Sequence, residues 1–216
     1  MINLIEDDNE EKFKKAIKNF KYAQNSGINK FERLDNWLEK ESKLYKAETK
    51  LKIKRYLHLK RGTLVKVDFG INPGSELCHT HFAIVLSKYD NITQETITVI
   101  PLTSKPGVGR IPLNNLIKDE LLNYLKKKKI TKNLEKEFTK ILEEYKKYKD
   151  FSYAYISQIT TISKSRLFYS KNKYDIINKV RCSADILNKI DDAIIENITG
   201  KKLINLSEKE EILIKT

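Results

Sequence analysis

Two histidines spaced two residues apart are the first candidates for a chemical role in this sequence. His79 and His81 lead into an apolar segment, and the chain has only three histidines. Residues i and i+2 of a β-strand point to the same face, so both imidazoles would share one face if both lie in a strand. An imidazole can act near neutral pH as a base, an acid or a cation. The alternative is that both are ordinary loop and strand-end residues.

Polar residues flank this pair in the same part of the chain. Ser75 and Glu76 belong to a loop before the histidines, and Thr103 ends the next apolar segment. The sequence contains no Gly-rich phosphate loop, HExxH, GxSxG or paired Cys/His pattern. Most common enzyme classes are therefore excluded, and we expect neither a metal nor another cofactor.

The overall charge favours a polyanionic partner. The 216 residues include 42 Lys and Arg against 29 Asp and Glu, a formal net charge of +13, which is typical of proteins that bind nucleic acid. A genome-wide preference for lysine is the alternative explanation. The longest apolar run, Phe82–Leu86, is far shorter than the ~20 residues that span a bilayer. We therefore expect no membrane association and a cytoplasmic location, with reduced thiols at Cys78 and Cys182.

The middle of the sequence has the pattern of short strands separated by turns. All four prolines and five of the seven glycines lie between residues 62 and 112. The β-branched and aromatic segments there, and one further on, predict strands. The predicted strands cover residues 63–69, 82–87, 96–102, 108–113 and 151–156. Such closely spaced strands favour a small barrel or a curled sheet.

Apolar residues at three- and four-residue spacings predict helices on both sides of this region and within it. The predicted helices cover residues 8–25, 29–57, 114–149 and 174–198. The fold class is therefore α+β, with an N-terminal helical arm, an inserted helix and a C-terminal helix. The arm and the insertion could pack against each other as a scaffold.

Five ordered segments resemble the blocks of the MazF/PemK toxin family. They are Arg61–Phe69, Gly74–Glu76, Phe82–Ser87, Val99–Ser104 and Gln158–Leu167. The resemblance implies an SH3-like small β-barrel of the MazF/PemK/CcdB-like kind, usually a homodimer. It also implies an endoribonuclease that cleaves single-stranded RNA without a metal and is held inactive by a cognate antitoxin protein.

The resemblance also assigns roles to single residues. Family members open the strand after the Gly-Ser-Glu loop with arginine and proline, where this chain has His81 and Phe82; the family's threonine is Thr103. We expect Thr103 to donate a hydrogen bond to the phosphate. We expect His81 to act as acid, base or phosphate ligand, because histidine titrates near neutral pH and arginine does not. His79 could complete a two-histidine arrangement.

Other positions match the family less closely. Some members carry an arginine and an aspartate just before the glutamine of the last block, where this chain has Tyr155 and Ser157. Arg110 and Arg166 could also contact the phosphate backbone. The residues expected to bind substrate are Ser75, Glu76, His79, Ser104, Lys105 and Gln158.

The resemblance suggests how the chain is divided. We predict a helical arm over residues 1–59, a toxin-like domain over 60–200 with its insertion at 114–149, and a tail over 201–216. The additions are either a scaffold or a surface for an antitoxin or a second subunit. Two further interpretations remain open: a binding module of the same fold that does not cut RNA, and a toxin regulated by its own arm.

Overall fold

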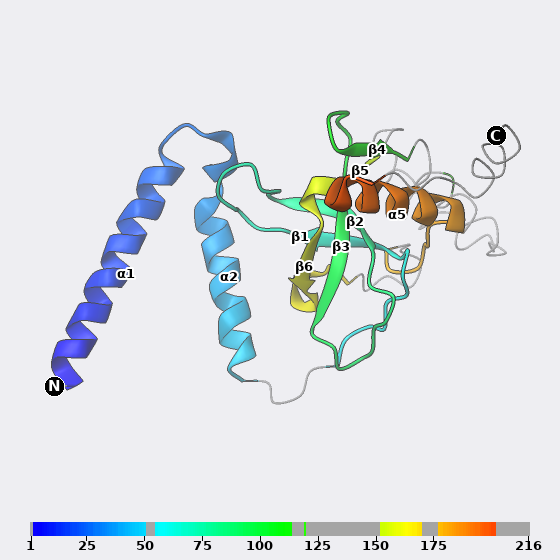
Figure 1. The fold of residues 1–216 in the computed structure, drawn as a ribbon. Helices are drawn as coiled ribbons and strands as arrows, with labels where there is room; N and C mark the ends of the chain where they lie inside the picture. Colours follow the sequence, from blue (N-terminus) through cyan, green and yellow to red (C-terminus); the bar gives the residue numbers. More distant parts are fainter. Residues whose placement is uncertain (1, 51–54, 114–118, 120–151, 170–176, 202–216) are drawn as a thin grey trace, which may run out of the picture. The chain divides into compact units, whose positions relative to one another are not determined.

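The computed structural model describes residues 2–50, 55–113, 119, 152–169 and 177–201. By its internal contacts the chain forms two compact units (Figure 1). The sheet unit comprises residues 55–68 and 80–216, and the helical unit comprises residues 1–54 and 69–79. The loop 69–79 is thus grouped with the helices rather than with the strands that it connects. Apart from residue 119, the helix predicted at 114–149 lies outside the described residues.

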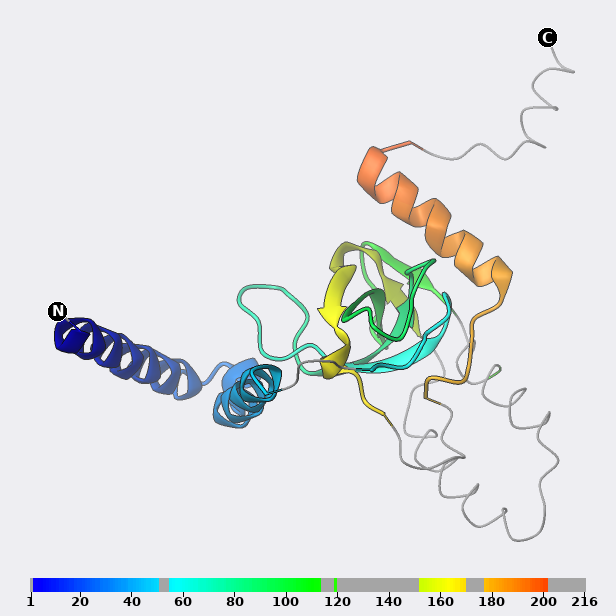
Figure 2. The same cartoon turned by 90° about the horizontal axis from the view of Figure 1, so that it is seen from below.

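The described residues of the sheet unit form six antiparallel strands. They are β1 (Leu64–Asp68), β2 (Thr80–Val85), β3 (Thr96–Thr103), β4 (Arg110–Pro112), β5 (Tyr153–Tyr155) and β6 (Thr160–Ser163). Their order is β1-β2-β3-β5-β4, with β6 paired to β3 beside this path. Together with the helices, these strands confirm the predicted α+β class. The sheet is strongly curled (Figure 2).

The described strands do not close into the barrel that we expected. After β6, a 3-10 turn (η4, Lys164–Arg166) interrupts the pairing. The residues that directly follow this turn contact β1 through an isolated bridge between Val67 and Leu167 and a hydrogen bond from Phe168 N to Lys66 O at 2.9 Å. A single bridge is not a ladder, so the edge between β6 and β1 stays incompletely paired.

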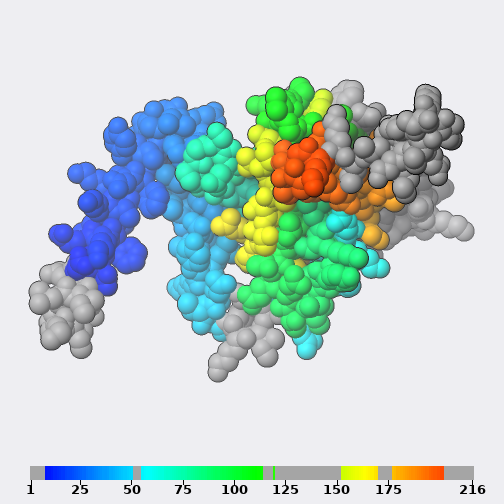
Figure 3. Space-filling model, in the orientation of Figure 1, coloured from blue at the N-terminus to red at the C-terminus, as the bar shows by residue number. Residues whose placement is uncertain are grey.

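One face of the sheet packs against the C-terminal helix, α5 (Ala184–Thr199). Ile190 of α5 is fully buried in a cluster with Leu64, Ile84 and Ile100. An ion pair between Arg61 and Asp191 joins the helix to the start of β1. Figure 3 shows α5, coloured orange to red, lying on the strands.

Among the described residues this helix begins only at Ala184, later than the predicted start at residue 174. Residues 177–183 are not helical, because their backbone pairs with the start of β1 instead. Asn178 N donates to Leu64 O and Leu64 N donates to Val180 O, each at 2.9 Å. Ile177 and Val180 are buried as the periodicity indicated, but they belong to a non-helical segment that begins with a turn at residues 177–179.

The opposite face of the sheet is also buried. Val65, Val67, Ala83, Val85 and Val99 are each 0% exposed. Because strand side chains alternate between the two faces, this second apolar layer explains why β1 to β3 are apolar almost throughout.

A buried ion pair lies at the edge of the sheet unit. The Lys164 ammonium is 2.6 Å from the Asp90 carboxylate, and their side chains are 0% and 1% exposed. Lys164 Nζ also donates to Asn91 O at 3.0 Å, and Asp90 accepts a hydrogen bond from Leu59 N at 2.8 Å. These bonds tie η4, the β2–β3 turn and the segment before β1 together.

In the described part of the helical unit, two helices are joined by a short 3-10 turn. The elements are α1 (Ile2–Gln24), η1 (Asn29–Phe31) and α2 (Leu34–Glu48). The predicted helix over residues 29–57 is therefore shorter than expected. The apolar stripe on α1 is present but stays exposed, with Phe13 at 71% and Ile17 at 53%. None of the described helices is both long enough and apolar enough to cross a membrane.

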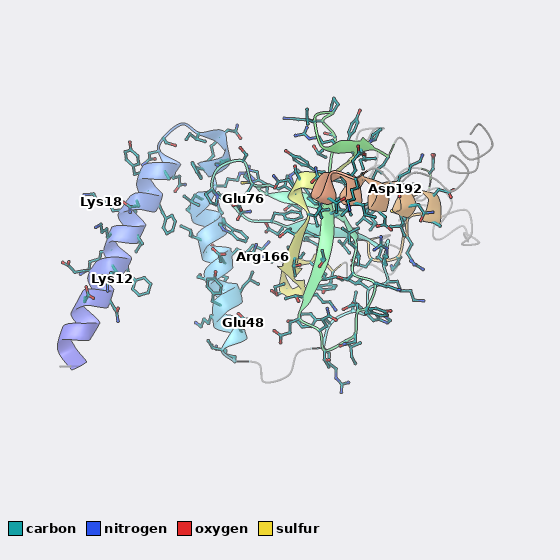
Figure 4. All side chains as sticks on the ribbon, viewed as in Figure 1. Lys12, Lys18, Glu48, Glu76, Arg166 and Asp192 are labelled. Carbon is teal, nitrogen blue, oxygen red and sulfur yellow. The ribbon has the colours of Figure 1, made fainter. Side chains whose placement is uncertain are left out.

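The loop 69–79 is held by the helices of its own unit. Lys30 Nζ donates to Asn72 O at 3.0 Å and to Gly74 O at 2.7 Å. The Trp37 ring of α2 lies against Gly70, so closely that a Cβ there would be 2.3 Å from the ring. Glu76 lies exposed on this loop (Figure 4). The arm therefore sets the conformation of the loop that leads into β2.

Replacing Gly70 by alanine should destabilise the helical unit. Gly70 has φ +82, which favours glycine, and the added methyl would clash with Trp37. We expect a loss of about 1–3 kcal/mol from overpacking and backbone strain. Trp37 is the only tryptophan, so a red shift of its fluorescence reports its displacement directly.

Gly27 provides the matched control for this prediction. It has φ +77 but no atom within 4 Å of the position of a Cβ. Gly27→Ala therefore imposes similar backbone strain without the clash and should leave the tryptophan emission in place. Equal effects of the two substitutions would show that the contact with Trp37 contributes nothing.

Candidate active site

His81 and Thr103 lie on neighbouring strands with their side chains on one face of the sheet. The register pairs Ala83 of β2 with Pro101 of β3. His81 lies two residues before Ala83, and Thr103 lies two residues after Pro101, so both are at the same end of this antiparallel pair. Their side chains therefore point to the same side of the sheet. Ala83 and Pro101 are fully buried, whereas His81 and Thr103 are partly exposed. The face of the sheet that is buried at Ala83 and Pro101 is therefore partly exposed to solvent at His81 and Thr103.

A hydrogen bond to the next strand determines which ring nitrogen of His81 carries the proton. His81 Nδ1 is 3.2 Å from the Leu102 carbonyl oxygen. A carbonyl can only accept, so Nδ1 donates and the neutral ring has its lone pair on Nε2. This tautomer gives His81 a nitrogen that can take up a proton from a substrate.

Thr103 lies at the last position of β3 and begins a tight turn. Its Oγ1 accepts a hydrogen bond from Lys105 N at 3.3 Å. A threonine hydroxyl can accept and donate at the same time, so this bond leaves its proton available for donation. Ser104 and Lys105 are exposed on the turn that follows.

Arg110 connects this turn to β5. Its Nη1 donates to Lys105 O at 3.0 Å and to Pro106 O at 2.9 Å. Its guanidinium lies 4.4 Å from the centre of the Tyr155 ring. A Cβ at Gly107 would be 3.1 Å from Nη1, so the absence of a side chain there lets the turn lie on the guanidinium. The sequence indicates Arg110 only as a possible phosphate contact, because bonds to a turn carbonyl have no local signal in the sequence.

The Arg110 guanidinium beside the phenol holds the pKa of Tyr155 below its ordinary value of 10.0, against the smaller effect of burial. A hydrogen bond with Ser157 lowers the pKa further. We expect Arg110→Met to raise the pKa of Tyr155. A difference titration of tyrosinate absorbance against Tyr155→Phe isolates this residue among the 11 tyrosines.

The sign of the effect on stability follows from the direction of this shift. The folded protein releases the Tyr155 proton at lower pH than the unfolded chain does. This residue therefore adds stability as the pH rises from its folded pKa toward 10, and the contribution is lost as the pH falls. Lys88→Met is the control, because Lys88 lies over the Tyr89 ring instead. A Tyr155 pKa that Arg110→Met leaves unchanged would exclude the guanidinium as the cause.

The remaining predicted residues are divided between the two units. Gln158 is half-buried at the end of η3 (Ile156–Gln158), directly after β5 in the sheet unit. Ser75, Glu76 and His79 lie on the loop of the helical unit. His79 has φ 68 and precedes the first residue of β2. The alternation of a strand therefore does not extend from His81 to His79.

Within the described part of the chain, no three His, Cys, Asp or Glu side chains gather into a group that could hold a metal ion. The candidate site consists instead of an imidazole, a hydroxyl and cationic side chains on one curled sheet. The chemistry available from these groups is proton transfer and hydrogen bonding to an anion.

An α+β domain built on a curled antiparallel sheet carries this site. A family model described as the PemK-like, MazF-like toxin of type II toxin–antitoxin systems matches residues 60–198. The match covers more than half of the chain, so this protein belongs to that family. A search of curated proteins finds no match. Membership implies an antitoxin as partner, and the arm before residue 60 lies outside the match.

Proposed function

We propose that this protein is a metal-independent endoribonuclease toxin that cuts single-stranded RNA, mRNA in particular, in the cytoplasm and so arrests growth. The observation that carries the proposal is the placement of His81 and Thr103 on one accessible face, with His81 Nε2 able to accept a proton. We further propose that it acts as a homodimer and that the antitoxin of its toxin–antitoxin pair inhibits it.

The proposed reaction uses the RNA's own 2′-hydroxyl. His81 Nε2 takes the 2′-hydroxyl proton while the 2′-oxygen forms a bond to phosphorus. The bond from phosphorus to the 5′-oxygen breaks, leaving a 2′,3′-cyclic phosphate and a 5′-hydroxyl whose proton comes from solvent or from a second acid. Thr103 donates to a non-bridging oxygen as charge develops there, with Lys105 nearby on the following turn.

A cleavage assay with matched substrates tests this function. The purified full chain, in excess chelator, should cut a single-stranded RNA and leave cyclic phosphate ends. The same sequence as DNA, or with 2′-O-methyl groups throughout, should stay intact because it lacks the nucleophile. If the protein binds RNA but leaves it uncut in every buffer, the alternative of a non-catalytic binding module replaces the enzyme.

A further inference from the structure

The two tyrosines of β5 lie on the same face of the sheet as the candidate catalytic pair. The register places Tyr153 opposite Thr103, and partners in an antiparallel ladder share a face. Tyr155 lies two residues further on and so faces the same side. Ala154 between them points to the α5 side and is 0% exposed. Both tyrosines are partly exposed, so they do not serve as core residues of the apolar cluster.

Arg110 supports one of these rings from the neighbouring strand. It is the register partner of Tyr155, and its guanidinium stacks at 4.4 Å from the ring centre. Two backbone carbonyls of the turn hold the guanidinium in place. A cation on one side of an aromatic ring fixes the orientation of the ring and strengthens its stacking surface.

We propose that Tyr153 and Tyr155, with Arg110 behind the second ring, form a site that stacks the nucleobases flanking the bond to be cut. The proposal rests on the proposed nuclease function and adds the surface that holds the RNA. Bases of single-stranded RNA present their π-faces, and proteins bind them by stacking on aromatic side chains arrayed on a sheet. Tyr153 faces Thr103 directly, so a stacked base would bring its phosphate toward the His81 and Thr103 side chains.

Photocrosslinking and affinity measurements on the full chain test the site. The probe is a pool of short single-stranded oligonucleotides of random sequence, with 2′-O-methyl groups to prevent cleavage and with photoreactive 5-iodouracil bases. We expect crosslinks at Tyr153 or Tyr155. Tyr155→Leu should weaken binding by about 5- to 150-fold, the range found for loss of one stacked base. Tyr155→Phe should bind as the unchanged protein does, because it keeps the ring.

Tyr89→Leu is the matched control. Tyr89 is 76% exposed and also carries a cation over its ring, but it lies on the turn after β2. This variant should bind and cut like the unchanged protein. If Tyr153→Leu and Tyr155→Leu both bind the probe normally while the unchanged protein cuts RNA, the stacking site is wrong and the nuclease proposal stands. Equal losses for Tyr155→Phe and Tyr155→Leu would point to the hydroxyl and overturn stacking. If the unchanged protein neither binds nor cuts RNA, the proposed function itself is lost.

Discussion

Replacing His81 by alanine is expected to slow RNA cleavage by about 10²- to 10⁴-fold, the usual contribution of a positioned acid or base. The loss should appear in kcat, because the imidazole accepts the proton only as the 2′-oxygen attacks. His81→Asn is the sharper variant. Its amide can keep the hydrogen bond to Leu102 O, yet it cannot take up a proton. Rates from single-turnover cleavage of one defined RNA give both effects.

The pH dependence separates a titrating histidine from a purely structural one. A base must be neutral to act, so the rate of the unchanged protein should fall as the pH drops through the range in which imidazoles ionise. The cleavage rate of His81→Asn should no longer fall over this pH range. His58→Ala, which removes an exposed histidine, should keep the fall. Normal cleavage by His81→Asn, or a flat profile for the unchanged protein, would remove His81 from the mechanism.

Breaking the buried pair between Lys164 and Asp90 is expected to destabilise the sheet unit by about 3–5 kcal/mol. Asp90→Ala leaves the ammonium at 0% exposure without its carboxylate. Lys164→Met leaves the buried Asp90 carboxylate without its ammonium partner. Desolvation is costly for either charge alone, and this cost rather than the attraction lost makes the effect large. Chemical denaturation followed by circular dichroism measures the change.

A double variant and an exposed pair complete this test. Lys164→Met combined with Asp90→Leu removes both charges, so it should be more stable than either single variant. Lys43→Met removes one partner of an ion pair whose side chains are 68% and 66% exposed, and it should change stability by less than about 1 kcal/mol. If the single variants at the buried pair are as mild as Lys43→Met, the pair contributes little to folding.

Alternating and periodic patterns predicted most of the described elements. The predicted strand at 96–102 corresponds to β3, and those at 63–69 and 151–156 contain β1 and β5. These signals are local: a strand that buries one or both faces must carry apolar or β-branched side chains in register. The segment 82–87 is less accurate, because β2 already begins at Thr80, whose neighbours are polar.

The elements that the sequence misassigned are those whose conformation depends on distant partners. Ile177 and Val180 have helical spacing, yet backbone bonds to Leu64 hold this segment in a non-helical conformation beside β1. His79 has strand-like spacing to His81, yet its backbone bonds to Phe69 and Gly70 give it a positive φ. In both cases pairing with another part of the chain outweighs local preference.

The amino-acid sequence by itself determined the family, the α+β class and the residues that could carry the chemistry, because these depend on residue types in order along the chain. Only the tertiary structure decided which groups meet. His81 contacts Leu102 across 21 residues, Lys30 contacts Asn72 across 42, and Lys164 contacts Asp90 across 74. Such pairs leave no periodic trace in the sequence, since each one exists only after the strands and helices have packed and excluded water between them.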